Sequence, residues 1–104
     1  LHGLNFWVRE KKSSTSELDY LYAFDGKLIP IEVKSGKEGA LRSLHNYMDI
    51  APHSLAIRLY AGERHITTIK TDSGKVYYLL SLPYYLVSQL DAYLSWFEKE
   101  VTSK

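Results

Sequence analysis

Short segments rich in aromatic and β-branched residues recur along the chain and predict a fold based on β-strands. Residues 6–8, 18–24 and 28–34 have this character, and residues 55–60 alternate apolar with polar positions. Two further segments, 65–71 and 76–82, flank a polar turn. We therefore expect a strand at each of these segments.

Two other segments carry apolar residues at helical spacing. The first predicted helix spans residues 37–49, with Leu41, Leu44 and Met48 on one face. The second begins with Pro83, which suits the first turn of a helix, and has one apolar stripe: Leu86, Leu90, Leu94 and Phe97. Because the first helix lies between two strands, we expect it to form a crossover between parallel strands.

The dipeptide Asp25-Gly26 lies between the second and third strand segments and is typical of a two-residue type I′ hairpin. Such a turn fixes the register by setting Phe24 opposite Lys27. The same count pairs apolar residues on one face: Tyr22 with Ile29, Tyr20 with Ile31, and Leu18 with Val33. Pro30 has no backbone donor, so we expect the strand on the other side of it to lose one hydrogen bond.

The opposite face of this hairpin is charged. The register sets Asp19 opposite Glu32 and Glu17 opposite Lys34, because side chains alternate along a strand. Two facing carboxylates repel each other by up to about 1 kcal/mol and need a compensating partner. A hard cation such as Mg²⁺ or Mn²⁺ prefers carboxylate oxygens, and Lys34 could orient or deprotonate an attacking water. The sequence predicts a metal-dependent phosphodiester-hydrolysing site with Asp19, Glu32 and Lys34 as catalytic residues.

The same residues resemble the PD-(D/E)xK nuclease superfamily, in which an acid on one strand is followed by acid-x-lysine on the next. Here the acid is Asp19 and the second strand reads Glu32-Val33-Lys34. Residues 6–10, 16–20 and 29–36 are more narrowly similar to domain of unknown function 4143, the C-terminal domain of prokaryotic AAA-type ATPases. This resemblance covers most of the chain. It implies an α/β (α+β) restriction-endonuclease-like core, a mixed β-sheet flanked by helices.

The resemblance also implies details of the site and its setting. The metal ligands would be Asp19, Glu32 and the backbone carbonyl of Val33, with Glu17 as a further candidate. In the family, a first helix bearing another glutamate precedes the first strand, and that helix is missing from this fragment. We therefore expect a longer chain with an upstream ATPase domain, and homodimerisation as one way to cover the open sheet face.

Nucleic acid is a candidate partner with Ser35, Lys37 and Arg42 as its contacts, and a merely solvated surface is the preferred interpretation of these positions. Many domains of this fold bind without cutting, so a catalytically inactive nucleic-acid- or protein-binding regulatory module of the ATPase remains open. A structural domain with a merely hydrated charged face is a third possibility. The four histidines lack metal-binding spacing. Tyr77-Tyr78 and Tyr84-Tyr85 could stack on nucleobases, but we interpret the nine tyrosines as packing residues with polar tips.

Composition narrows the setting of this predicted site. The 104 residues, 45% of them hydrophobic, suit one domain over residues 1–104. The chain has no cysteine, which excludes thiolate zinc sites and favours a cytoplasmic location. No apolar run approaches the roughly 20 residues that cross a membrane. With a formal net charge of +1, any binding of nucleic acid must come from a local patch.

Overall fold

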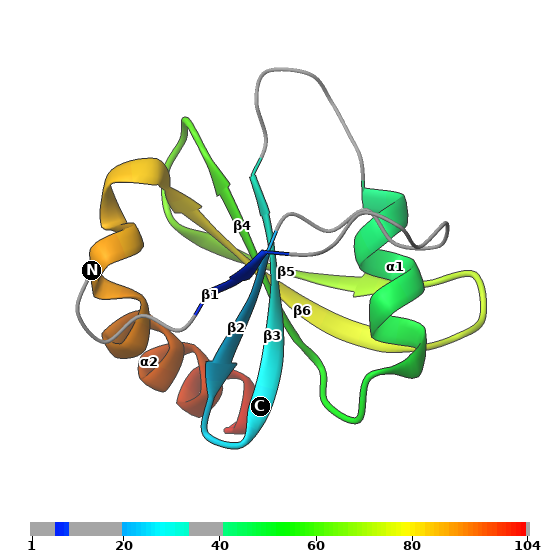
Figure 1. The fold of residues 1–104 in the computed structure, drawn as a ribbon. Helices are drawn as coiled ribbons and strands as arrows, with labels where there is room; N and C mark the ends of the chain where they lie inside the picture. Colours follow the sequence, from blue (N-terminus) through cyan, green and yellow to red (C-terminus); the bar gives the residue numbers. More distant parts are fainter. Residues whose placement is uncertain (1–5, 9–19, 34–40, 104) are drawn as a thin grey trace.

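The structure is a computed structural model that describes residues 6–8, 20–33 and 41–103. Within these residues, one mixed sheet has the strand order β1-β2-β3-β4-β6-β5, and helices lie on both of its faces (Figure 1). The elements are β1 (Phe6–Val8), β2 (Tyr20–Phe24), β3 (Lys27–Val33), α1 (Leu41–Ile50), β4 (Leu55–Tyr60), β5 (His65–Lys70), β6 (Val76–Pro83), the 3₁₀ helix η1 (Tyr84–Gln89) and α2 (Leu90–Thr102). The predicted mixed sheet flanked by helices is confirmed.

The hairpin between β2 and β3 has the turn that the sequence predicts. Asp25 and Gly26 both have positive φ, 50° and 75°, as a type I′ turn requires. The observed pairs are Phe24 with Lys27, Tyr22 with Ile29, and Tyr20 with Ile31. The predicted register is therefore confirmed as far as Tyr20. Its continuation to Leu18, Asp19 and Glu17 lies outside the described residues.

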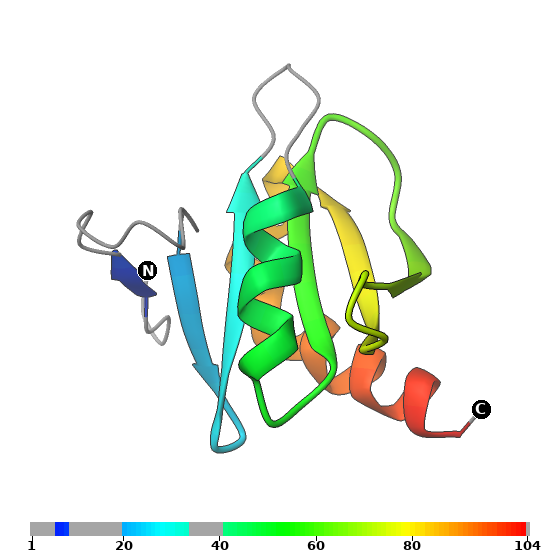
Figure 2. The same cartoon turned by 90° about the vertical axis from the view of Figure 1, so that its right-hand side faces the viewer.

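The central strands are parallel. β3 pairs with β4 and β4 with β6 in parallel, with α1 as the crossover between β3 and β4. The pairing of β3 with β4 begins at Ile31, just after Pro30, so the missing proline donor does not interrupt this ladder. β3, β4 and β6 all end at the same end of the sheet, which we call the carboxyl end (Figure 2).

Each face of the sheet has its own apolar core. On one face, Leu44 and Met48 of α1 pack on Ala56, Tyr77 and Leu79. Burial raises the pKa of Tyr77 to about 12, so its hydroxyl stays neutral there and forms a 2.9 Å hydrogen bond with Nδ1 of His45. On the other face, α2 packs through the predicted stripe: Leu90, Leu94 and Phe97 are buried, and Leu86 is partly buried.

Polar contacts fasten the β2–β3 hairpin to α2. The buried Tyr22 donates a 2.5 Å hydrogen bond to the Asp91 carboxylate, and burial is the main reason why the pKa of Tyr22 is raised. Near the turn, Lys27 Nζ lies 2.9 Å from Glu98 Oε2. The position of the hairpin therefore depends on the closing helix as well as on the sheet.

Two predictions for the end of the chain were wrong. Pro83 is the last residue of β6 rather than part of the first helical turn, and a 3₁₀ helix precedes α2. The proline precedes η1 in an extended conformation, with φ −61° and ψ 146°. The packing role expected for all tyrosines holds for the buried Tyr77 but fails for Tyr84 and Tyr85, which are exposed. These two tyrosines follow β6 directly and lie at the carboxyl end of the sheet.

Candidate functional site

A row of polar residues crosses the sheet close to its carboxyl end. Glu32 of β3 is the register partner of Arg58 of β4, which in turn is the partner of Ser81 of β6. His65 of β5 continues the row opposite Ser81. These side chains share the face of α1, because Arg58 comes two residues after Ala56, which packs against that helix. Along β4 and β6, the row lies two residues beyond the apolar core under α1, towards the carboxyl end of the sheet.

The guanidinium of Arg58, in the middle of this row, is only partly satisfied. Its Nη2 donates a long hydrogen bond of 3.4 Å to Ser81 Oγ, and its Cζ lies 5.6 Å from the centre of the Tyr60 ring. Its Nε is buried and has no hydrogen-bond partner among the described residues. Among the residues that the structure describes, no carboxylate forms an ion pair with Arg58. A half-buried guanidinium in this state favours an anionic ligand that would supply the missing acceptors.

The Tyr60 ring beside Arg58 is held from several sides. Its hydroxyl donates a 2.6 Å hydrogen bond to the Glu63 carbonyl and lies 3.2 Å from Nδ1 of His65. The backbone of Gly62 also approaches it closely, since a Cβ there would lie only 2.5 Å from the ring atom Cζ. Glycine at this position lets the chain turn tightly over the ring. Tyr60 is therefore a fixed aromatic surface next to a cation.

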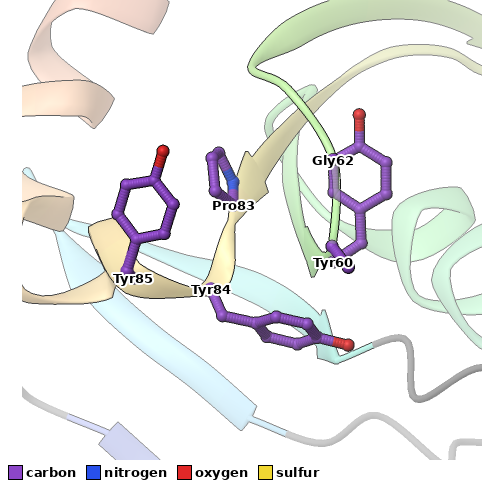
Figure 3. Close-up of a pocket in the computed structure, with 6 residues that line it drawn as sticks. Tyr60, Gly62, Pro83, Tyr84 and Tyr85 are labelled. Atoms are coloured by element: carbon purple, nitrogen blue, oxygen red, sulfur yellow. The ribbon is translucent and has the colours of Figure 1, made fainter.

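A hollow of about 420 Å³ opens beside this ring. It is lined by residues that follow or end the parallel strands: Tyr60, Ala61, Gly62, Pro83, Tyr84 and Tyr85. In Figure 3, Tyr60 and Tyr85 stand on opposite sides of Pro83, with the ring of Tyr84 below them. Tyr84 is 40% exposed and Tyr85 is 78% exposed. Aromatic side chains thus face solvent at the same end of the sheet as the polar row.

The structure describes some of the residues that the sequence predicts for the site. Glu32 and Val33 end β3 at the carboxyl end, and both are half-buried. Arg42, a candidate nucleic-acid contact, is exposed in the first turn of α1, and Figure 2 shows that this helix begins at the same end of the sheet. The remaining predicted residues lie outside the described ones: Glu17, Asp19, Lys34, Ser35 and Lys37.

Sequence reasoning missed Arg58 and Ser81, and it preferred a packing role over base stacking for Tyr84 and Tyr85, which are exposed. Arg58 did carry a signal, because it is a cation at a polar position inside an otherwise apolar strand. Its proximity to Glu32 depends on the pairing of β3 with β4, which no local pattern specifies. Ser81 carried no signal of its own.

The described residues supply only part of a metal site. Among them, no three His, Asp or Glu side chains gather as a metal ion would require. Glu32 is the carboxylate of the row, and its Oε1 is buried. An oxygen ligand of this kind fits Mg²⁺ or Mn²⁺, but one carboxylate and one backbone carbonyl need further ligands. The fit therefore depends on Asp19, whose position is predicted from the hairpin register.

The fold and this site define an α+β protein whose polar and aromatic groups meet at the carboxyl end of a mixed sheet. A family model described as a domain of unknown function (DUF4143) matches residues 1–85. The match covers most of the chain, so the chain belongs to this family, as the sequence motifs indicate. No curated protein and no solved structure matches the chain. Glu32, Arg58 and the exposed tyrosines all fall within the matched region, whereas α2 follows it.

One further property concerns membranes. Among the described helices, none combines the length and the apolar character needed to cross a lipid bilayer.

Proposed function

We propose that this domain is a metal-dependent nuclease module, with a restriction-endonuclease-like core, attached to an upstream ATPase domain in a longer chain. The observation that carries the proposal is the pairing of Glu32 with Arg58 at the carboxyl end of parallel strands. An acidic residue beside an unsatisfied cation suits a phosphodiester, which needs both metal ligands and a partner for its charge. Ligand sites in open α/β sheets commonly lie at this end.

Each residue has a distinct role in this proposal. Asp19, Glu32 and the carbonyl of Val33 would hold Mg²⁺ or Mn²⁺, and Glu17 is a further candidate ligand. Bound there, the cation would polarise the phosphodiester and lower the pKa of a coordinated water. Lys34 would orient or deprotonate the attacking water, and Arg58 would neutralise charge on the phosphoryl oxygens. Ser35, Lys37 and Arg42 would contact the neighbouring backbone.

A second candidate function is binding of nucleic acid without cleavage. The same pairing favours it, because a guanidinium next to Glu32 offsets part of the negative charge that would otherwise attract a divalent cation. In this form the module would anchor the ATPase to nucleic acid. The two candidates differ in the role of Glu32. A nuclease needs Glu32 for cleavage, whereas a module that only binds nucleic acid does not need it.

The test compares cleavage and binding in the same preparations. Labelled single-stranded DNA, duplex DNA and RNA are incubated with Mn²⁺ and with Mg²⁺, and products are separated on denaturing gels. We expect cleavage by the wild type, a loss of at least about a hundredfold in Glu32→Gln, and a loss of similar order in Lys34→Ala. Glu100→Gln, an exposed carboxylate change on α2, serves as the matched control and should cut normally.

Binding measured by fluorescence anisotropy in the presence of EDTA separates the two functions. Binding that survives Glu32→Gln, together with a wild type that cuts nothing, would establish the second candidate and exclude the first. Equal cleavage by the wild type and Glu32→Gln would show that the observed nuclease activity does not come from this site.

A further inference from the structure

Tyr60, Tyr84 and Tyr85 line the hollow, and the last two face solvent. Tyr85 exposes 78% of its surface, although burying an aromatic side chain is among the larger stabilising contributions available to a small domain. We propose that the hollow binds an unpaired nucleobase, so that the substrate class is nucleic acid with a single-stranded segment at the site. This inference rests on the proposed function and names its substrate.

The chemistry of the lining fits a base better than a phosphate. Besides its aromatic rings, the hollow is lined by Ala61, Gly62 and Pro83, none of which carries a polar side chain. Flat bases stack on such rings whatever their sequence, because every base has a π-face. The volume of about 420 Å³ lies within the range of small-molecule sites. A base inside an intact duplex could not reach it, since its faces are already covered by its neighbours.

Tyr60 connects the hollow to the cation. The Arg58 guanidinium lies 5.6 Å from the centre of the Tyr60 ring, and the same ring lines the hollow. A nucleotide could therefore place its phosphate on Arg58 and its base against the tyrosines. The hydrogen bond from Tyr60 to the Glu63 carbonyl keeps this ring in place without a ligand, which lowers the entropic cost of binding.

Charge complementarity selects the occupant. The unsatisfied Nε of Arg58 and its lack of an ion pair among the described residues call for an anion next to the aromatic surface. A nucleotide unit combines an anion and a flat ring within one short molecule. An apolar peptide would fill the hollow but leave the arginine unsatisfied.

The experiment separates bases from backbone charge. Fluorescence anisotropy, with EDTA present to prevent cleavage, measures binding of a labelled oligothymidine of about twelve nucleotides, an abasic strand of the same length, and a blunt duplex. We expect the wild type to bind the oligothymidine about tenfold more tightly than the abasic strand or the duplex. Tyr85→Ala and Tyr84→Ala should each reduce this preference, and the double variant should remove it.

The matched control is Ile50→Ala, because Ile50 is 80% exposed and ends α1 at the opposite end of the sheet. It should keep the full preference. Circular dichroism melting checks that the tyrosine variants remain folded, as expected for exposed side chains.

The outcomes distinguish this inference from the proposed function. If the wild type binds the abasic strand or the duplex as tightly as the oligothymidine, or if the double variant keeps the preference, the inference is wrong while nucleic-acid binding stands. If no oligonucleotide binds at all, the proposed function fails as well.

Discussion

The two ends of the sheet differ in how far their polar side chains are satisfied by hydrogen bonds within the fold. At the end where β4 and β6 begin, which we call the amino end, Lys75 Nζ donates to three backbone carbonyls at the end of α1 and beyond it. These are the carbonyls of Met48, Ala51 and His53, at 2.8, 3.0 and 2.9 Å. The last carbonyls of a helix have no partner within the helix, so this ammonium group satisfies them and also suits the negative end of the helix dipole.

The amino end contains two further satisfied groups. The Asp49 carboxylate accepts hydrogen bonds from Thr71 Oγ1 at 2.7 Å and from Ser73 Oγ at 3.1 Å. His53 Nδ1 accepts a hydrogen bond from the Leu55 backbone N–H at 3.1 Å. Its Nε2 lies 2.8 Å from the Leu28 carbonyl oxygen and donates to it, so the ring is neutral and carries its proton on Nε2.

The carboxyl end differs in one buried cation and in two exposed aromatic side chains. Arg58 keeps a buried Nε without a hydrogen-bond partner in the described residues, and Tyr84 and Tyr85 face solvent there. Lys75, Asp49 and His53 at the amino end are satisfied within the fold, whereas Arg58 at the carboxyl end is satisfied only in part. Groups retained without a structural benefit are the ones expected to meet a ligand.

Lys75→Met should produce the largest loss of stability. The substitution keeps most of the length of the side chain but leaves three carbonyls without their charged donor. We expect the free energy of unfolding to fall by about 2 kcal/mol. Urea denaturation followed by circular dichroism measures it. Lys70→Met, at the exposed end of β5, is the matched control and should stay within about 0.5 kcal/mol of the wild type. Equal effects in the two variants would contradict a structural role for the amino end.

His53 should make stability depend on pH, with a smaller effect. Burial lowers the pKa of His53 below its ordinary value of 6.5, and the nearby Lys75 and Lys27 act in the same direction. Above pH 6.5 the ring is neutral in both states and its stabilisation is complete. As the pH falls from 6.5 towards the lowered pKa, the unfolded chain takes up a proton that the folded protein resists, so stability decreases.

Urea midpoints at pH 7.5 and pH 5 test this linkage. The midpoint of the wild type should fall more over this interval than that of His53→Gln, which keeps a donor and an acceptor but does not titrate. The difference between the two proteins isolates His53 from the other histidines. A parallel shift of both proteins would show that the pKa of His53 does not differ between the folded and unfolded states.

Local patterns were sufficient to predict much of the fold. The Asp25-Gly26 turn specified the register down to Tyr20, because a two-residue loop permits only one pairing. The stripe from Leu90 to Phe97 identified the buried face of α2. Pro83 was misjudged because an extended conformation preceding a helix and the first helical turn have the same φ, so proline is compatible with both. No sequence pattern in residues 84–89 distinguished the 3₁₀ helix η1 from the start of an α-helix.

The candidate site could be predicted only where its residues are neighbours in the sequence or across one tight turn. Glu32 and its predicted partner Asp19 belong to the same hairpin, so their pairing follows from counting. Arg58 is adjacent to Glu32 only because α1 returns the chain in parallel, and its register depends on the packing of the whole crossover. The exposure of Tyr85 was equally inaccessible, because its position after β6 depends on how η1 leaves the sheet.

Arg58→Met should have the smallest effect on stability and a clear effect on binding. Methionine retains the apolar stem of the side chain. The change removes a weak 3.4 Å hydrogen bond and the 5.6 Å contact with the Tyr60 ring, but it also removes a buried donor that has no acceptor in the described residues. These contributions oppose each other, so the free energy of unfolding should change by no more than about 0.5 kcal/mol. The same variant should bind oligothymidine more weakly, and its salt dependence should have a slope smaller by about one ion. A loss above about 1 kcal/mol with unchanged binding would make Arg58 a structural residue like Lys75, and the two ends of the sheet would then no longer differ in kind.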